Sequence, residues 1–254
     1  MQLIALPDIP RVAPGADLVG LVLDGLVRAD TALQTGDIVV LAQKIVSKAE
    51  NRYVELAGVT PSARALEIAA VAEKDPRIIE VILGESRAVL RQVPGVVIVE
   101  HRLGFVMANA GVDASNIEHA GERVERVLLL PCDPDGTAAA LATALRERTG
   151  AAVGVVINDS VGRAWRNGTV GIALGSAGFP ALYDRRGERD LFGRVLQVTE
   201  VALADQIAAA ASLVQGEADE GRPVVLVRGL SWPREAPHSN ASALLRPRER
   251  DLFR

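Results

Sequence analysis

The sequence has very little cysteine, few aromatic residues and almost no lysine. Cys132 is the only cysteine among the 254 residues, so an internal disulfide framework is excluded and a reducing compartment is favoured. Phe, Trp and Tyr make up 3% of the chain. We therefore expect a core of Ala, Val, Leu and Ile, with Cys132 as a small buried residue. Of the 28 basic residues, all are arginines except Lys44, Lys48 and Lys74. Because codon usage can produce such a bias, only arginines in a suggestive local setting are given weight.

Other absences limit the partners of the protein. No run approaches the ~18 apolar residues that a membrane helix needs, and the N-terminus lacks the basic and apolar regions of a signal peptide. The 28 basic residues are outnumbered by 32 acidic ones, so no basic excess is available for nucleic-acid phosphates. We expect a soluble, cytoplasmic protein with small-molecule substrates and neither a nucleic-acid nor a membrane partner.

Several familiar motifs of catalysis and nucleotide binding are missing. There is no Gly-x-x-x-x-Gly-Lys-[Ser/Thr] loop, which excludes a P-loop site. Gly171, Gly175 and Gly178 have the wrong spacing for the Gly-x-Gly-x-x-Gly of a Rossmann site. The three histidines form no zinc-binding spacing, and no Gly-x-Ser-x-Gly elbow supports α/β-hydrolase chemistry.

Apolar strand patterns alternate with alanine-rich helical patterns along the chain, which predicts a mixed α/β fold of the α+β type. One catalytic unit, or two closely packed subdomains, is expected over 1–230, and a C-terminal arm or tail over 231–254. Strands are predicted at 38–42, 96–100 with a hairpin partner at 104–108, 127–130, 153–157, 195–199 and 224–227. Helices are predicted from an N-cap at Thr60 to Val71, from the turn at 133–136 to a C-cap at Gly150, and from about 202 to 214.

Three acidic segments lie beside apolar runs and glycines. In the first, 109–116, Asp113 and Asn116 offer oxygen and amide groups, although an ordinary Asx-rich turn is the favoured interpretation of that segment alone. In the third, 214–222, a glycine C-cap followed by a charged loop is likewise the simpler interpretation. We therefore assign a function to these two segments only in combination with the second segment.

The second segment, 157–168, favours function. Asp159 and Ser160 follow a buried strand and are hard oxygen donors suited to Mg²⁺ or Mn²⁺. Arg163 and Arg166 are three residues apart, so on a helical turn both guanidinium groups would face one anion. The glycines that follow would let the chain wrap a ligand. An N-capping Asp-Ser with solvated arginines is the alternative, and Trp165 either stacks on a ring or simply packs.

From the residues alone, this combination suggests metal-assisted transfer on a polyanionic substrate. A nucleotide-dependent ligase, a metal-dependent phosphohydrolase and a non-catalytic anion-binding module all remain open.

Seven segments, taken in order, resemble the coenzyme F420-0:L-glutamate ligase family. The resemblance extends from residue 6 to residue 230 and includes Val-Ser-Lys-Ala-Glu at 46–50 and Asp-Leu-Phe-Gly-Arg at 190–194. It implies the mixed α/β fold of that family and an intertwined homodimer. It also implies a GTP-dependent ligase that activates a carboxylate of the deazaflavin F420-0 as an acyl phosphate. The amine of L-glutamate then displaces phosphate, and GDP is released. The other matching segments are 6–9, 109–116, 158–168, 204–209 and 227–230.

The same resemblance implies the ligands and their residues. Two divalent cations, Mg²⁺ or Mn²⁺, and a K⁺ ion are expected beside the GTP. The matching metal positions are Asp113, Asp159, Ser160 and Glu217. The matching GTP positions are Leu6, Pro7, Asp8, Ile9, Gln43, Lys44, Lys48, Asn116, Gln215, Gly216, Glu217, Ala218, Asp219, Glu220, Gly221 and Arg222.

Three further expectations go beyond the family match. Arg163 and Arg166 are predicted to hold the phosphodiester of the coenzyme or the carboxylates of glutamate. The glycine-rich segment 168–178 is predicted to be a moving cover that keeps water from the acyl phosphate. Some relatives carry a C-terminal flavin-binding domain for which 254 residues leave no room, so we expect the addition of one or two glutamates.

Overall fold

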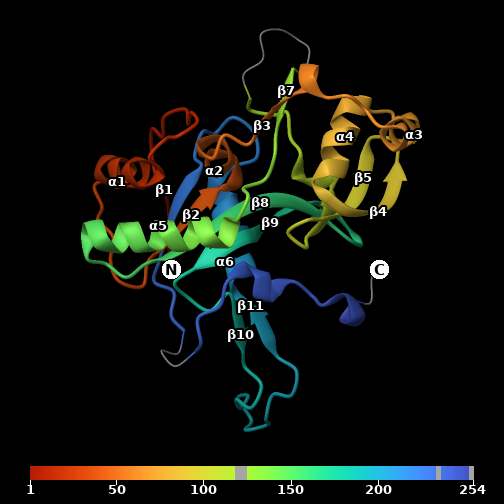
Figure 1. Ribbon diagram of the computed structural model, residues 1–254. Coiled ribbons are helices and arrows are strands. Elements are labelled where there is room, and N and C mark those ends of the chain that lie inside the picture. The colour runs from red at the N-terminus through yellow and green to blue at the C-terminus, as the bar shows by residue number, and fades with distance from the viewer. Residues whose placement is uncertain (118–124, 233–235, 252–254) are drawn as a thin grey trace.

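A five-stranded sheet lies at the centre of the computed structural model, which describes residues 1–117, 125–232 and 236–251 (Figure 1). The strands lie in the order β1-β12-β2-β8-β9. Strands β2 and β8 run parallel, and the other neighbouring pairs that the structure describes in this sheet are antiparallel. The bounds are β1 Gln2–Ala5, β2 Ile38–Ala42, β8 Gly154–Arg163, β9 Arg166–Ala177 and β12 Val224–Arg228.

Helices cover both faces of this sheet. Val39 and Leu41 of β2 pack on one face with apolar residues of α1 and α5, while Ile38 and Val40 pack on the other with α6. Because successive side chains of a strand point to opposite faces, a strand covered on both sides must be apolar throughout, as Ile-Val-Val-Leu-Ala is. The helix bounds are α1 Leu18–Arg28, α2 Gln43–Ala49, α5 Pro134–Thr149 and α6 Leu203–Gln215.

A smaller antiparallel sheet, β4-β5-β6, packs with two helices beside the central sheet (Figure 1). Glu85 forms ion pairs there with Arg102 and with Arg52, and the Arg52 Nε also donates to the carbonyl of Leu130 at 2.9 Å. These contacts tie the smaller sheet to the rest of the chain. The bounds are β3 Tyr53–Glu55, which pairs with β7 Arg126–Leu128, and α3 Ala63–Ala72, α4 Pro76–Gly84, β4 Ser86–Val93, β5 Val96–His101 and β6 Val106–Ala108.

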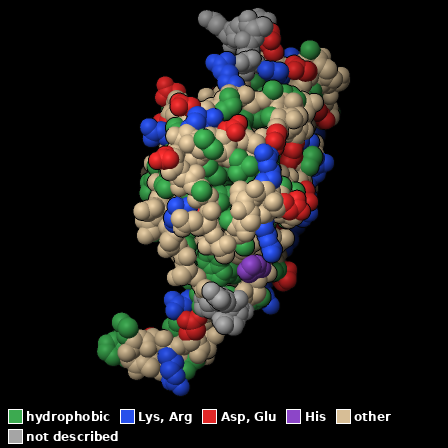
Figure 2. All heavy atoms as spheres, turned by 90° about the vertical axis from the view of Figure 1, so that its left-hand side faces the viewer, with side chains coloured by type: hydrophobic (Ala, Val, Ile, Leu, Met, Phe, Trp, Pro, Cys, Tyr) green, Lys and Arg blue, Asp and Glu red, His purple; other side chains and the backbone are tan. Residues whose placement is uncertain are grey.

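A long arm extends from the body of the protein. Strands β10 (Leu182–Asp184) and β11 (Glu200–Ala202) form its base, and residues 185–199 form its outer part (Figure 1). Hydrophobic side chains gather at the outer end of this protrusion in the space-filling view (Figure 2). Leu191 and Phe192 are 99% and 96% exposed, an unusual setting for large apolar residues.

The end of the chain returns to the body. Ala241 is fully buried in the core beneath α6. Its N–H and that of Ser242 donate to the carboxylate of Asp135 at 2.9 and 3.1 Å. Residues 236–251 therefore lie against the central unit, and the domain boundary at residue 230 stays a prediction. No helix in the described ranges is both long enough and apolar enough to cross a membrane.

The predicted fold class is confirmed, as are most of the predicted elements. The strands at 38–42 and 96–100 and the hairpin partner of the latter are present. Helix α5 ends, as predicted, at Gly150, whose φ of 77° is the left-handed conformation that glycine tolerates.

Three local predictions are wrong. The N-cap of α3 is Ser62 rather than Thr60, because the Ser62 hydroxyl accepts the Ala65 N–H at 3.2 Å. The strand predicted at 195–199 is displaced: the observed strand is β11, Glu200–Ala202, because only these residues pair with β10, while residues 185–199 project into solvent. Cys132 is exposed rather than buried, because it lies in a loop anchored by its own N–H, which donates to Glu50 at 3.0 Å.

The segment 157–178 differs most from prediction. Arg163 and Arg166 lie on no helix: they face each other across the turn of the β8–β9 hairpin. Gly168, Gly171 and Gly175 belong to β9 and Gly178 follows its last residue, so the predicted moving cover at 168–178 is wrong. Strand β9 is hydrogen-bonded along β8, and its glycines allow close approach of helices. A Cβ at Gly171 would lie 2.6 Å from the Ala208 carbonyl oxygen of α6, and one at Gly175 would overlap the Pro134 carbonyl of α5.

This close packing predicts a large difference between two glycines of the hairpin. We expect Gly175→Ala to lower the free energy of unfolding by about 1–3 kcal/mol, because backbone atoms of α5 must move to make room. Gly162→Ala is the control, since a Cβ there meets nothing within 4 Å, and a change within about 0.5 kcal/mol is expected. Urea denaturation followed by circular dichroism measures both, and equal loss in the two variants would contradict the packing described.

Candidate active site

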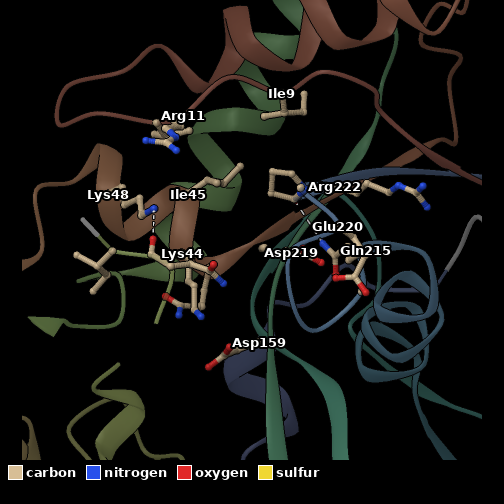
Figure 3. Close-up of a pocket in the computed structure, with 18 of the residues that line it drawn as sticks. Ile9, Arg11, Lys44, Ile45, Lys48, Asp159, Gln215, Asp219, Glu220 and Arg222 are labelled. Atoms are coloured by element: carbon tan, nitrogen blue, oxygen red, sulfur yellow. Dashed lines mark hydrogen bonds between the residues drawn. The ribbon is translucent and has the colours of Figure 1, made fainter. Parts of the chain in front are cut away.

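A cavity opens where the pairing of β2 with β8 ends. Ala42, the last residue of β2, pairs with Asn158 of β8, and because the strands are parallel their chains leave the pairing at one edge of the sheet. Ligands of α/β sheets bind at such edges. The cavity has a volume of about 800 Å³ and is lined by residues 9–14, 42–45, 158–160 and 215–223, together with side chains of α2, β3 and β7 (Figure 3).

Three carboxylates, those of Asp113, Asp159 and Glu217, interact electrostatically at or beside this cavity. Asp159 is partly buried on β8, and burial raises its pKa to about 7, with the charges of Asp113 and Glu217 adding to the rise. The Ser160 N–H, which donates to Asp159 at 2.9 Å, and the charge of Lys44 act in the opposite direction. In the protein without ligands, Asp159 therefore carries a proton through much of the range below neutral pH.

Asp113 has the opposite character because Lys44 pairs with it. The Lys44 Nζ lies 2.7 Å from the Asp113 Oδ2 and 2.6 Å from the Ser115 hydroxyl. Burial alone would raise the pKa of Asp113, but the hydrogen bond from Lys44 and those from Ser115 hold it below its usual value. Its backbone is fixed by two hydrogen bonds to Leu128, at 3.0 and 2.8 Å. Below neutral pH, an ionised Asp113 and a largely protonated Asp159 therefore both interact with the charge of Lys44.

A second lysine joins the loops above the carboxylates. The Lys48 Nζ donates to the Asn116 carbonyl at 2.7 Å, and the Asn116 side chain donates to the Ala218 carbonyl at 3.4 Å. Within the 215–223 loop, the Glu220 carboxylate accepts the Ala218 N–H at 2.9 Å, and such backbone hydrogen bonds lower its pKa. Segments from three distant parts of the sequence are therefore held together at the mouth of the cavity.

A buried amide pair fixes the end of α6 on the sheet. Asn158 donates to the Gln215 side chain at 2.7 Å and accepts from it at 3.2 Å, and Gln215 also donates to the Pro223 carbonyl at 3.3 Å. Both ends of the loop that carries Glu217 are thereby anchored.

The comparisons with known proteins agree with this arrangement. Residues 8–229 match the model of the family described as F420-0:Gamma-glutamyl ligase. The chain belongs to the F420-0:γ-glutamyl ligase family. It is 45% identical over its whole length to the coenzyme F420:L-glutamate ligase of Methanothermobacter thermautotrophicus, of which it covers 99%. The enzyme of the same name from Methanopyrus kandleri is 45% identical over 96% of this chain and 94% of its own length. The enzyme of that name from Haloarcula marismortui is 40% identical over 100% of this chain and 96% of its own length.

Membership in this family confirms the predicted relationship, and with it the prediction that the chain is an enzyme of the ligase class. The structure brings most of the residues predicted for the ligase site to the cavity. Its lining includes Ile9, Gln43, Lys44, Lys48, Asn116, Asp159, Ser160, Gln215, Gly216, Glu217, Ala218, Asp219, Glu220, Gly221 and Arg222.

Other predicted residues lie outside the lining of the cavity. Leu6 is fully buried in the core, and the Pro7 carbonyl accepts from Arg28 at 3.2 Å. Asp8 is exposed and has a left-handed φ of 51°, which turns the chain so that Ile9 reaches the cavity. Asp113 is connected to the cavity by its ion pair with Lys44, which lines the cavity. Arg163 and Arg166 lie further along β8 and β9, beyond the lining.

Sequence reasoning missed several lining residues, above all Arg11 and Asn158. Arg11 follows the predicted 6–9 segment directly, and Asn158 precedes Asp159, so proximity to predicted residues was the available signal. Arg126, whose guanidinium lies 4.6 Å from the centre of the Tyr53 ring, also lines the cavity. The sequence offered no signal for that pair, because β3 and β7 are 70 residues apart and meet only in the fold.

The donor set suits a metal that is shared with a substrate. Among the residues that the structure describes, no three acidic, histidine or cysteine side chains are grouped closely enough to form a metal cage. Mg²⁺ usually takes one or two protein carboxylates and completes its shell with water and substrate phosphates. The hard oxygens of Asp113, Asp159, Ser160 and Glu217 fit such a shared site.

The raised pKa of Asp159 predicts the pH dependence of stability without ligands. The pKa of Asp159 is about 7 in the folded protein and near 4 in the unfolded chain. As pH rises from 4 to 7, the unfolded chain gives up this proton more readily than the folded protein, so the free energy of unfolding falls. Above pH 7 it falls no further. We expect Asp159→Asn to remove this loss and to stabilise the metal-free protein at pH 8 by up to about 4 kcal/mol. The gain should shrink towards pH 4.

Thermal unfolding in the presence of a chelator, from pH 4.5 to pH 8, tests this expectation. Asp24→Asn, on the exposed side of α1, is the matched control and should leave the pH profile of the wild type unchanged. A stability gain that is equal at all pH values would contradict the raised pKa.

Proposed function

We propose that this chain joins L-glutamate to the deazaflavin coenzyme F420-0 in a GTP-dependent reaction. The carboxylate of F420-0 accepts the γ-phosphoryl group of GTP, giving an acyl phosphate and GDP. The glutamate amine then forms the amide, and phosphate leaves. The observation that carries the proposal is that Asp159, Glu217, two lysines and the 215–223 loop converge on one cavity, with Asp113 paired to Lys44 beside it, in a chain whose family is known. The names of its relatives support the choice of F420 and glutamate.

The cavity suits a nucleoside triphosphate. Its volume of about 800 Å³ lies within the usual range for small-molecule sites. Arg11, Lys44, Lys48 and Arg222 supply positive charge around it. Two hydrogen bonds within the 215–223 loop fix its conformation, so its backbone is arranged before a nucleotide enters. We assign this loop and Ile9 to GTP binding.

Asp113, Asp159, Ser160 and Glu217 would hold two divalent cations, Mg²⁺ or Mn²⁺, together with the phosphates. Bound there, the cations would neutralise the negative charge that grows on the phosphates during transfer. Asp159 would lose its proton when the cations bind, because nearby positive charge favours its ionised form. The predicted K⁺ ion stays an expectation with no donor residues assigned to it.

Lys44 and Lys48 have separate roles in this proposal. Lys44 holds Asp113 in place until the cations and phosphates arrive and then lies beside the phosphate chain as a point charge. Lys48 holds the Asn116 carbonyl at 2.7 Å, which keeps the 113–117 segment against the nucleotide loop.

Arg163 and Arg166 remain our candidates for an anionic group of the acceptor substrates. They are cross-strand partners, so both side chains leave the hairpin on one face. Two guanidinium groups so placed suit a phosphodiester or a carboxylate.

The exposed arm supports the proposal of a homodimer. Leu191, Phe192 and Val198 are at least 84% exposed, and a protruding element with apolar side chains is stabilised when another surface covers it. A second copy of this chain is the occupant that the family resemblance implies.

The test combines purified protein with GTP, Mn²⁺, L-glutamate and F420-0, followed by mass spectrometry and nucleotide analysis. We expect a product heavier by one or two glutamyl units and one GDP per unit added. Asp159→Asn should lower turnover by at least about a hundredfold, whereas Asp24→Asn should not. GTP loss without a heavier product would instead indicate the phosphohydrolase, and tight GTP binding without any product would indicate a binding module.

A further inference from the structure

The buried amides of Asn158 and Gln215 use all of their N–H donors within the wall of the cavity. The two side chains are 3% and 9% exposed. The Gln215 Nε2 donates to the Asn158 Oδ1 at 3.2 Å and to the Pro223 carbonyl at 3.3 Å. The Asn158 Nδ2 donates to the Gln215 Oε1 at 2.7 Å and to the Ser212 hydroxyl at 3.3 Å. Because an amide group has two N–H donors, neither side chain has one left for the phosphates of a nucleotide.

This network joins four segments that are far apart in the sequence. Asn158 lies on β8, and Gln215 is the last residue of α6. The Pro223 carbonyl, which accepts from Gln215, also accepts the Ala42 N–H at 2.8 Å. Ala42 ends β2 and directly precedes α2. The ends of β2 and α6, the end of the 215–223 loop and the middle of β8 are therefore held together by one set of hydrogen bonds.

The segments lead from this network directly to charged groups of the proposed site. Asp159 is the residue after the asparagine, Glu217 lies two residues after the glutamine, and Lys44 lies two residues after the alanine. Consecutive Cα atoms are 3.8 Å apart, so each of the three backbones lies within about 8 Å of the network. Besides the effect of burial, the charges of Lys44 and Glu217 shift the pKa of Asp159 in opposite directions. The three side chains therefore lie within electrostatic range of one another, and a shift of the network would move them apart.

Stability alone does not require amides at these two positions. Replacing both members of a buried hydrogen-bonded pair with apolar groups of the same shape is nearly neutral for stability. A hydrogen bond differs from an apolar contact because it requires donor and acceptor within about 3.2 Å and nearly in line. The amide pair thus fixes the end of α6 at one position along β8. Such precision matters most for groups that bind one ligand together.

We propose that the Asn158–Gln215 pair sets the distance between Asp159 and Glu217 and thereby the affinity of the site for its divalent cations. Both amides are positioning residues in this scheme and touch no reacting atom. Gln215 serves the nucleotide through the loop that follows it, not through a hydrogen bond from its own side chain. The inference rests on the proposed function, because the cation site belongs to it.

Binding of Mn²⁺ in the presence of a saturating non-hydrolysable GTP analogue tests the pair without any turnover. Electron paramagnetic resonance of free Mn²⁺ gives the Kd for wild type, Asn158→Ala, Gln215→Met and the double variant. We expect each single change to raise the Kd about tenfold, as loss of residues that orient metal ligands does elsewhere. The double variant should bind no more weakly than the weaker single variant, because either change already breaks the pair.

Arg228→Lys is the control for a general loss of stability. It removes the paired hydrogen bonds of Arg228 to buried Asp37, at 2.9 and 2.7 Å, at the opposite end of β2. We expect urea denaturation to show a less stable protein whose Kd for Mn²⁺ is that of the wild type. The same denaturation measurement shows which variants are folded under the binding conditions.

Three results would overturn the inference. The first is a wild-type Kd in the folded single variants. The second is a loss in Gln215→Met that Asn158→Ala does not share, or losses that add in the double variant, because the two side chains would then act separately. The third is an equal loss in Arg228→Lys. A wild type that binds Mn²⁺ but makes no glutamylated product contradicts the proposed function alone, whereas a wild type that binds no Mn²⁺ contradicts both.

Discussion

The parallel pairing of β2 with β8 is the constraint on which the rest of the site depends. It brings the ends of two segments more than 100 residues apart to one sheet edge, so that α2 with its lysines begins beside Asp159. A third segment joins them, because the Ala42 N–H donates to the Pro223 carbonyl at 2.8 Å. At the opposite end of β2, buried Asp37 accepts two hydrogen bonds from Arg228, at 2.9 and 2.7 Å. Loss of one partner of such a pair costs about 3–5 kcal/mol.

Two partly buried carboxylates accept hydrogen bonds from the backbone of β9. Strand β9 is the outermost strand next to β8, so alternate N–H groups along it face away from the β8 ladder. Asp205 accepts that of Ala173, and Asp135 accepts that of Ser176, both at 2.9 Å. Burial raises the pKa of Asp205, although the hydrogen bond opposes the rise. Since the strand next to Asp159 is fixed from both helices, Asp159 and Ser160 are positioned on a rigid element of the fold.

Much of this could be predicted from local sequence patterns, and the failures have a common cause. Periodicity and caps located β2, β5 and α5, because their apolar patterns and the glycine at position 150 act locally. The spacing of Arg163 and Arg166 was compatible with a helix, but pairing with β9 outweighed it, and the glycines of β9 proved to be contact points for helices. Tyr53 and Arg126, like the pairing of Lys44 with Asp113, depend on contacts between distant segments, which no local pattern encodes. Apart from Asp159 and Ser160, which the residues alone suggested as metal donors, the proposed ligand positions came only from resemblance to a family.

In the proposed function, Asp113 pairs with Lys44 in the ligand-free protein and with a divalent cation when the nucleotide is bound. Without ligands, Lys44 occupies the place beside Asp113 that a cation would take. A crystal structure with Mn²⁺ and a non-hydrolysable GTP analogue, with anomalous scattering to locate the metal, tests this directly. We expect Mn²⁺ bound by Asp113 and Asp159, with the Lys44 ammonium moved from Asp113 to the phosphates. Manganese elsewhere in the protein, or Lys44 still paired with Asp113 beneath a bound nucleotide, would contradict the proposed site.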